Sequence, residues 1–166
     1  MLGYARNELC STNRSVRAAL TNPTYATRNL GRASCGGQAM GVDGRLAGRR
    51  VLIVEDEAMI AALIEGILDE VGCSVVGPVA GAPRALEAIE RERIDAVLLD
   101  VCDGGSRSYL LADALIARGV PFIFVSGLAR RDMPSAYRAC AYLTKPFTPE
   151  ALLAALDKVV GRPRAS

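Results

Sequence analysis

From Arg49 onward, short hydrophobic stretches alternate with segments in which hydrophobic residues recur every three or four positions. A run of four or five hydrophobic residues bounded by turn residues is typical of a strand that is buried on both faces. The sequence therefore predicts five strands, at residues 51–54, 74–77, 95–99, 121–125 and 141–144.

The segments between these strands predict amphipathic helices, because their hydrophobic residues fall on one helix face. The pattern is clearest between Met59 and Val71, and Gly72 follows where a left-handed residue commonly ends a helix. The last helix is predicted to have Thr148 as its N-cap and Pro149 in its first turn. Expected core residues of the last three helices are Leu86, Ile89, Leu111, Ala114, Leu115, Leu152, Leu153, Leu156, Val159 and Val160.

Strands that alternate with helices indicate a parallel sheet with right-handed crossovers and helices on both faces. The segment between the fourth and fifth strands departs from this pattern. Residues 128–138 have little hydrophobic periodicity and include Arg130, Arg131, Asp132 and Pro134. We therefore expect the fourth helix to be reduced to a turn or an irregular segment.

Residues 1–48 differ from the rest of the chain, since six arginines oppose two acidic residues and no hydrophobic period is sustained. We predict a disordered or weakly ordered basic extension over 1–48, a folded domain over 49–161 and a short basic tail over 162–166. The composition of the extension is compatible with an organellar transit peptide or with weak binding to nucleic acid. A third alternative is that Met40 is the natural start, because the folded pattern begins a few residues after it.

The chain contains no histidine, which excludes histidine general bases, Ser-His-Asp triads and histidine metal ligands. Its five cysteines are scattered without a C-x-x-C pair, so they fit reduced thiols better than a disulfide framework or a zinc site. Glu65 interrupts the run from Met59 to Leu68, and no membrane span is expected. These features predict a cytoplasmic protein that does not interact with membranes.

Polar residues of a particular kind follow four of the predicted strands. Glu55, Asp56 and Glu57 follow the first strand, and Asp100, Ser126 and Lys145 follow the third, fourth and fifth. Ligands of open parallel sheets bind beyond the carboxyl ends of the strands, so these groups are expected to converge. Neighbouring carboxylates repel each other unless they share a cation, and Mg²⁺ prefers carboxylate oxygens. The sequence therefore predicts a magnesium site at this edge.

Each of these residues also has a purely structural interpretation. Asp56 suits a helix N-cap and Glu57 the positive end of a helix dipole, whereas Ser126 with its following glycine suits a turn. Lys145 is harder to explain as a solvated turn residue, because it is one of only two lysines among 20 basic residues. A lysine is a compact charge that can reach a phosphate or a carboxylate.

Four segments carry a specific resemblance: VLIVEDE at 51–57, AVLLD at 96–100, FVSG at 124–127 and AYLTKPF at 141–147. Together they resemble the receiver domain of bacterial two-component response regulators, over the region from Arg49 to Val160. The resemblance implies a flavodoxin-like (CheY-like) α/β fold: a five-stranded parallel sheet of order 2-1-3-4-5, with helices on both faces.

The resemblance also implies a role for each motif residue. Asp100 would accept a phosphoryl group from a phosphohistidine on another protein, a sensor histidine kinase or a histidine phosphotransfer protein. Asp56 and Asp100 would bind Mg²⁺ directly, together with the main-chain carbonyl of Cys102, and Glu55 would bind it through water. The phosphoryl-binding and switch residues would be Lys145, Ser126 and Tyr142. Without the resemblance, Tyr142 is a half-buried strand aromatic.

No output pattern is evident in residues 1–48 or after Gly161, so we expect a stand-alone receiver that acts by binding a downstream protein or by passing on its phosphoryl group. Nucleic acid is not an expected partner, and a homodimer stays open. Two enzyme classes remain as alternatives. An aspartate phosphohydrolase would want a second aspartate two residues after Asp100, where Cys102 stands, and a toprim-like nuclease would not need Lys145.

Overall fold

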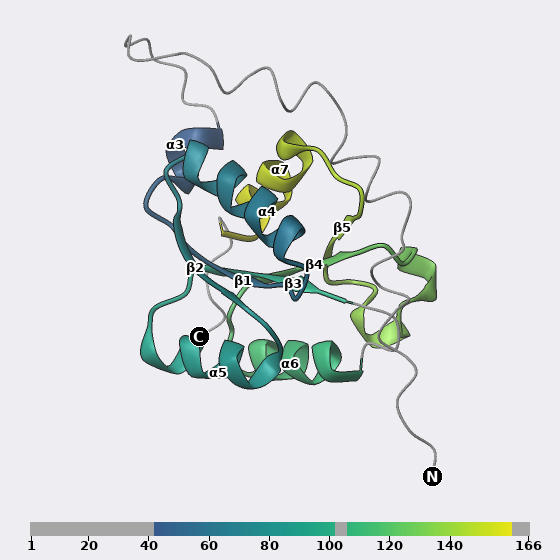
Figure 1. Cartoon of the computed structure of the whole chain (residues 1–166). Helices are drawn as coiled ribbons and strands as arrows, with labels where there is room; N and C mark the ends of the chain where they lie inside the picture. The colour runs from purple at the N-terminus through teal and green to yellow at the C-terminus, as the bar shows by residue number, and fades with distance from the viewer. Residues whose placement is uncertain (1–41, 102–105, 161–166) are drawn as a thin grey trace, which may run out of the picture.

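The computed structural model describes residues 42–101 and 106–160, which form a five-stranded parallel sheet of order β2-β1-β3-β4-β5 (Figure 1). This confirms the predicted fold and strand order. The strands are β1 (Arg50–Val54), β2 (Ser74–Val79), β3 (Ala96–Asp100), β4 (Phe122–Ser126) and β5 (Ala141–Thr144).

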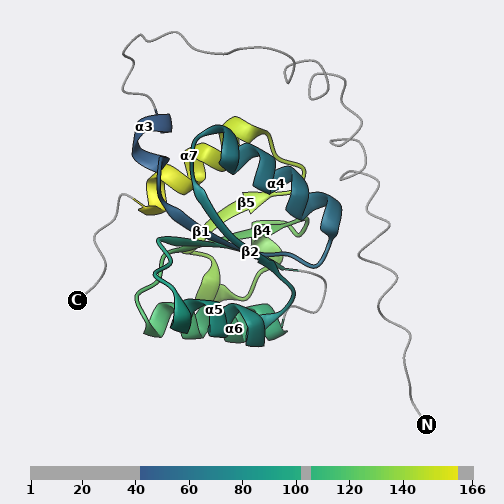
Figure 2. The same cartoon turned by 60° about the vertical axis from the view of Figure 1, so that its left-hand side comes forward.

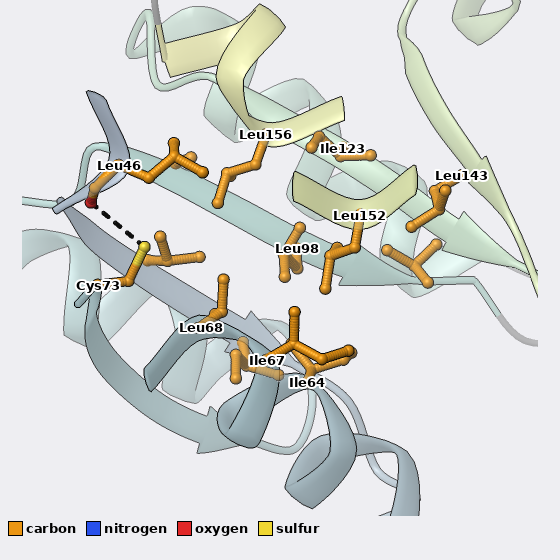
Figure 3. Packing of buried hydrophobic residues seen from close by; sticks show 14 of the residues in the cluster. Leu46, Ile64, Ile67, Leu68, Cys73, Leu98, Ile123, Leu143, Leu152 and Leu156 are labelled. Atoms are coloured by element: carbon orange, nitrogen blue, oxygen red, sulfur yellow. Dashed lines mark hydrogen bonds between the residues drawn. The ribbon is translucent and has the colours of Figure 1, made fainter. Parts of the chain in front are cut away.

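Helices cover both faces of the sheet (Figures 1 and 2). One face carries α4 (Ala58–Glu70) and α7 (Pro149–Val160), and the other carries α5 (Ala82–Arg91) and α6 (Ser106–Ala117). Alternate strand residues supply the two cores: Ile53 packs on the side of α4 and α7, whereas Leu52 packs on the side of α5 and α6. Figure 3 shows the first core, in which Ile64 and Leu68 of α4 and Leu152 of α7 meet Leu98 of β3.

The observed strand ends differ slightly from the predicted ones, and the shift matters for the site. Asp100 and Ser126 are the last residues of β3 and β4, whereas the hydrophobic pattern had placed them just beyond the strands. Their main chains are in register with the neighbouring strands, Asp100 opposite Val125 and Ser126 opposite Thr144. The sheet therefore sets where both residues lie along the edge of the site.

Strand β2 continues to Val79, two residues beyond the predicted end at Gly77. The β1–β2 register shifts between Leu52 and Val54, and Gly77 lies at this irregularity with a φ of 93°. A Cβ atom there would lie 3.0 Å from the carbonyl oxygen of Ile53. Glycine therefore lets the strand remain paired through the shift.

The folded part begins earlier than predicted. The charge pattern places residues 42–48 in the basic extension, but Val42–Leu46 forms the short helix α3, and the Leu46 side chain is fully buried between α4 and α7 (Figure 3). The Cys73 thiol donates to the Leu46 carbonyl oxygen at 3.3 Å, and the Gly48 N–H donates to the Gly72 carbonyl oxygen at 2.7 Å. A single buried leucine forms no repeating pattern, so hydrophobic periodicity could not indicate that Leu46 belongs to the core. The rest of the predicted extension, residues 1–41, and the tail lie outside the described residues.

The fourth helix is absent as an α-helix, as expected. Two single 3₁₀ turns, η1 (Arg130–Asp132) and η2 (Ser135–Tyr137), occupy the connecting segment 127–140 between β4 and β5. Arg138 holds this segment together, because its guanidinium donates to the carbonyl oxygens of Met133 at 3.0 Å and Arg131 at 2.8 Å. Met133 is buried and anchors the segment in the second core. Across the described residues, no helix has the length and hydrophobicity that crossing a membrane requires.

Candidate phosphoacceptor and metal site

The carboxyl ends of β1, β3 and β5 bring Glu55, Asp100 and Lys145 into direct contact. The Lys145 Nζ donates to Glu55 Oε2 at 2.6 Å and to Asp100 Oδ1 at 2.7 Å. All three side chains are nearly buried, with exposed fractions of 2% for Glu55, 8% for Lys145 and 9% for Asp100. A single ammonium group therefore bridges two carboxylates from strands that are far apart in the sequence.

The pKa values of Glu55 and Lys145 reflect their contact and their burial. Burial and, second, the charge of Asp100 raise the pKa of Glu55 to about 7, although Lys145 opposes both effects. Burial alone would lower the pKa of Lys145, but the two carboxylates together outweigh it and raise this pKa to about 12. Lys145 is thus a firmly protonated cation, and the site still carries more negative charge than it can neutralise.

Three carboxylates at this edge can hold a metal ion. Glu55, Asp56 and Asp100 each offer an oxygen, and these oxygens lie within 4.8 Å of one another. Asp56 is exposed at the mouth of the site, while Glu55 also accepts the N–H of Glu57 at 3.1 Å. Hard oxygen donors and uncompensated negative charge are what Mg²⁺ requires, so the residues present fit this ion. Cys102, whose carbonyl was predicted as a further ligand, lies outside the described residues.

Ser126 lies beside the site with a buried side chain. Its hydroxyl donates to the carbonyl oxygen of Val101 at 2.6 Å and accepts the N–H of Leu128 at 3.2 Å. The only hydroxyl proton of Ser126 is therefore held by the main chain that follows Asp100. In this structure Ser126 donates to the protein backbone.

Tyr142 is connected to the same loop. Its phenol donates to the carbonyl oxygen of Leu128, and the guanidinium of Arg130 lies 5.6 Å from the centre of its ring. Arg130 also donates to the carbonyl oxygens of Arg138 at 2.9 Å and Cys140 at 3.0 Å. Tyr142 is half-buried, and burial raises its pKa. Tyr142 therefore contacts the start of the connecting segment directly, at Leu128 and Arg130, and Arg130 links it to the end of the segment.

Two groups of residues near the site were missed in the sequence. Ser108 of α6 donates its hydroxyl to the main-chain carbonyl oxygen of Asp100 at 2.9 Å. Tyr109 and Tyr137 stack with ring centres 4.8 Å apart, and the Tyr137 phenol donates to Asp113 at 2.8 Å. A serine in the first turn of a helix has no distinctive sequence pattern, and stacking between an α-helix and a 3₁₀ turn follows no fixed spacing. Only the tertiary structure reveals them.

Similarity to known proteins identifies the family of this chain. A family model described as the response regulator receiver domain matches residues 51–157, which is more than half of the chain. The chain belongs to the response regulator receiver family. Receiver domains of this kind are phosphoacceptor signalling modules rather than enzymes, which overturns both enzyme alternatives. They are phosphorylated by histidine kinases and bind Mg²⁺ in an acidic pocket, here the cluster of Glu55, Asp56 and Asp100.

Curated relatives of this receiver domain include the transcriptional regulatory protein PdtaR of Mycobacterium tuberculosis. It is 35% identical over 121 residues, a region that covers 69% of this chain and 58% of PdtaR. The uncharacterized transcriptional regulatory protein YbdJ of Bacillus subtilis is 36% identical over 114 residues, which cover 65% of this chain and 49% of YbdJ. The chain thus spans about half the length of the curated relatives it matches.

Solved structures similar to this receiver domain include isolated receiver domains. SdrG from Sphingomonas melonis Fr1 is 39% identical with a TM-score of 0.56, and the match covers 66% of this chain and 96% of SdrG. The receiver domain of a sensor histidine kinase from Pseudomonas aeruginosa PAO1, solved with a magnesium ion in its active site cleft, is 29% identical with a TM-score of 0.60. That match covers 70% of this chain and 100% of the other.

Proposed function

We propose that this receiver domain accepts a phosphoryl group on Asp100 from a phosphohistidine of a sensor histidine kinase or a histidine phosphotransfer protein in the cytoplasm. The observation that carries the proposal is the contact of 2.7 Å between Asp100 Oδ1 and Lys145 Nζ, in a site that Asp100 shares with Glu55 and Asp56. Because the receiver domain contains no histidine, the phosphohistidine that donates the group lies outside this domain. Detection of an acyl phosphate that depends on both Asp100 and Mg²⁺ is the direct test.

Each residue of the site has a proposed role. Asp56 and Asp100 bind Mg²⁺ directly, with Glu55 acting through water and the Cys102 carbonyl as a further ligand. When bound, the ion screens the negative charge that carboxylates and phosphoryl group bring together. Lys145 already contacts Asp100 Oδ1, so its ammonium is placed to bind an oxygen of the phosphoryl group that is transferred to this carboxylate. Ser126 donates its hydroxyl to another phosphoryl oxygen once it leaves Val101.

Asp56→Asn is expected to weaken Mg²⁺ binding by tenfold or more, and Glu55→Gln by a smaller factor. The first change removes a direct anionic ligand, whereas Glu55 is already engaged by Lys145 and by the Glu57 N–H. Calorimetric titration with Mg²⁺ measures both affinities. Glu65→Gln, a change on α4 away from the cluster, is the matched control and should bind as the wild type does. Equal losses in the two site variants, or a larger loss in Glu55→Gln, would contradict the assigned roles.

We further propose that a downstream protein recognises the connecting segment 127–140 together with Tyr142. Support comes from the chain of contacts that begins at Ser126, whose hydroxyl accepts the Leu128 N–H, and continues through the Leu128 carbonyl to Tyr142 and Arg130. If Ser126 turns toward a phosphoryl group, Leu128 and Tyr142 must move with it, and the segment can settle into a second, more restrained conformation. A charge-assisted hydrogen bond can shift a two-state equilibrium about ten- to a hundredfold.

Phosphorylation is expected to slow amide hydrogen exchange in residues 127–142, because the new bond from Ser126 restrains a segment that has only 3₁₀ turns. In Ser126→Ala the slowing should disappear while Asp100 is still phosphorylated. Exchange monitored by mass spectrometry before and after phosphorylation measures both. Ser135→Ala, which removes an exposed hydroxyl within the same segment, should respond as the wild type does. A change confined to other regions, or an identical response in Ser126→Ala, would disprove this coupling.

A further inference from the structure

Two hydroxyl groups hold two consecutive main-chain carbonyls at the end of β3. Ser108 donates to the carbonyl oxygen of Asp100 at 2.9 Å, and Ser126 donates to that of Val101 at 2.6 Å. Ser108 belongs to α6 and Ser126 to β4, so the two donors come from different elements. The peptide between Asp100 and Val101 is therefore held on one side by β4, because the Val101 N–H donates to the Val125 carbonyl oxygen at 3.2 Å, and on the other side by the Ser108 hydroxyl.

The two hydroxyls are not equivalent during phosphorylation. Ser126 has one proton, which cannot be donated to Val101 and to a phosphoryl oxygen at the same time. When Ser126 turns to the phosphoryl group, the carbonyl of the buried residue Val101 loses this donor. Ser108 faces no such choice, because its partner is the main chain of Asp100 and not its carboxylate. Its hydrogen bond can persist in both states.

The position of Ser108 in α6 also indicates that its hydroxyl serves the end of β3 and not the helix. It is the third residue of α6, where alanine would favour the helix more than serine does. Ser108 lies in the first turn of α6, so the carbonyls one turn earlier in the chain belong to residues before the helix. The Ser108 hydroxyl instead reaches eight residues back, to strand β3. Its hydrogen bond thus serves the end of the strand.

We propose that Ser108 is a positioning residue for phosphoryl transfer: its hydroxyl fixes the main chain of Asp100 and thereby the direction in which the Asp100 carboxylate points. It acts through Asp100 and touches neither the phosphoryl group nor Lys145. The inference rests on the proposed role of Asp100 as phosphoacceptor. Rotation of the Asp100 peptide would displace its carboxylate from the Lys145 Nζ, now at 2.7 Å, and small displacements of a reacting group slow a transfer step considerably.

The test compares phosphorylation rates of the full chain with acetyl phosphate as donor at saturating Mg²⁺, well below the melting temperature of each variant. Ser108→Ala is expected to lower the maximal rate about three- to tenfold, the range of one hydrogen bond, and to leave the half-saturating donor concentration within about twofold. Ser108→Thr retains the hydroxyl and should recover the rate to within about twofold of wild type. Ser74→Ala, an exposed serine at the start of β2, should match the wild type.

The order of the two Ser108 variants separates positioning from a merely structural role. Helix propensity ranks alanine above threonine, so a role limited to helix stability would make Ser108→Thr the poorer variant, whereas positioning makes Ser108→Ala the slower one. A maximal rate in Ser108→Ala equal to that of wild type, or Ser108→Thr as slow as Ser108→Ala, would overturn the inference. A wild-type protein that gains no phosphoryl group would instead refute the proposed function, which keeps the two failures distinct.

Discussion

Replacement of Asp100 by asparagine is expected to abolish phosphorylation of this receiver domain completely. With Mg²⁺ and acetyl phosphate, the wild-type chain should gain one phosphoryl group, because Asp100 alone of the three clustered carboxylates ends the central strand β3, where it contacts Lys145 and lies beside Glu55 and Asp56. Asparagine has nearly the same shape as aspartate but cannot form an acyl phosphate. Intact-mass spectrometry before and after incubation measures the gain directly.

Two controls test whether the mass gain is specific to Asp100 and depends on Mg²⁺. Asp69→Asn makes the same chemical change on the exposed side of α4 and should be phosphorylated as the wild type is. Chelation of Mg²⁺ should prevent the mass gain in every variant, since the ion offsets the repulsion between the carboxylates and the incoming group. A comparable gain in Asp100→Asn, or a wild-type gain that persists without metal, would refute the assignment.

Leu46→Ala is expected to destabilise the domain by about 2 to 5 kcal/mol, although Leu46 precedes the region that the family model matches. The side chain is fully buried and packs with Leu68 of α4 and Leu156 of α7 (Figure 3). Alanine would leave a cavity where these elements meet. The melting temperature should fall by roughly 8 to 20 °C, which thermal denaturation followed by circular dichroism measures.

Two truncations test whether the loss of Leu46, and not of the residues before it, lowers the melting temperature. Removal of residues 1–39 should leave the melting temperature unchanged, because that segment has no periodic hydrophobic pattern and none of the motif residues. Removal of residues 1–48 takes Leu46 away and should lower the melting temperature at least as far as Leu46→Ala does. If the longer truncation melts like the full chain, Leu46 is not part of the core in solution. A fall on removing residues 1–39 would show that this part also packs on the domain.

The fold was largely predictable because its information is local and repetitive. Buried parallel strands read as continuous hydrophobic runs, and each helix between them shows a 3.6-residue period, so the five strands and four of the α-helices could be recognised separately. The same logic predicted the absent fourth helix, since residues 128–138 lack that period. Strand ends were less certain: Asp100 and Ser126 belong to their strands because neighbouring strands pair with them, which no single segment encodes.

The candidate site was foreseeable to a similar extent. In a parallel sheet all carboxyl ends lie at one edge, so the polar residues that end four strands had to be neighbours, and the structure brings Glu55, Asp56, Asp100 and Lys145 together. Their individual roles as metal ligand, phosphoacceptor and phosphoryl-binding group remain predictions that the variants above test. What the pattern could not indicate is that Lys145 bridges Glu55 and Asp100 directly, which depends on side-chain geometry.

The sequence by itself determined the order of the elements, the hydrophobic faces on which they pack and the chemistry at the strand ends, because each follows from the period of a short segment. Only the tertiary structure decided that Leu46 completes the core and that the Ser126 proton is held by Val101. It also decided that Ser108 reaches Asp100 across eight residues. These contacts join isolated side chains to main-chain atoms on other elements. Such pairs leave no repeating pattern in the sequence, since their distance is fixed by how the helices and strands pack.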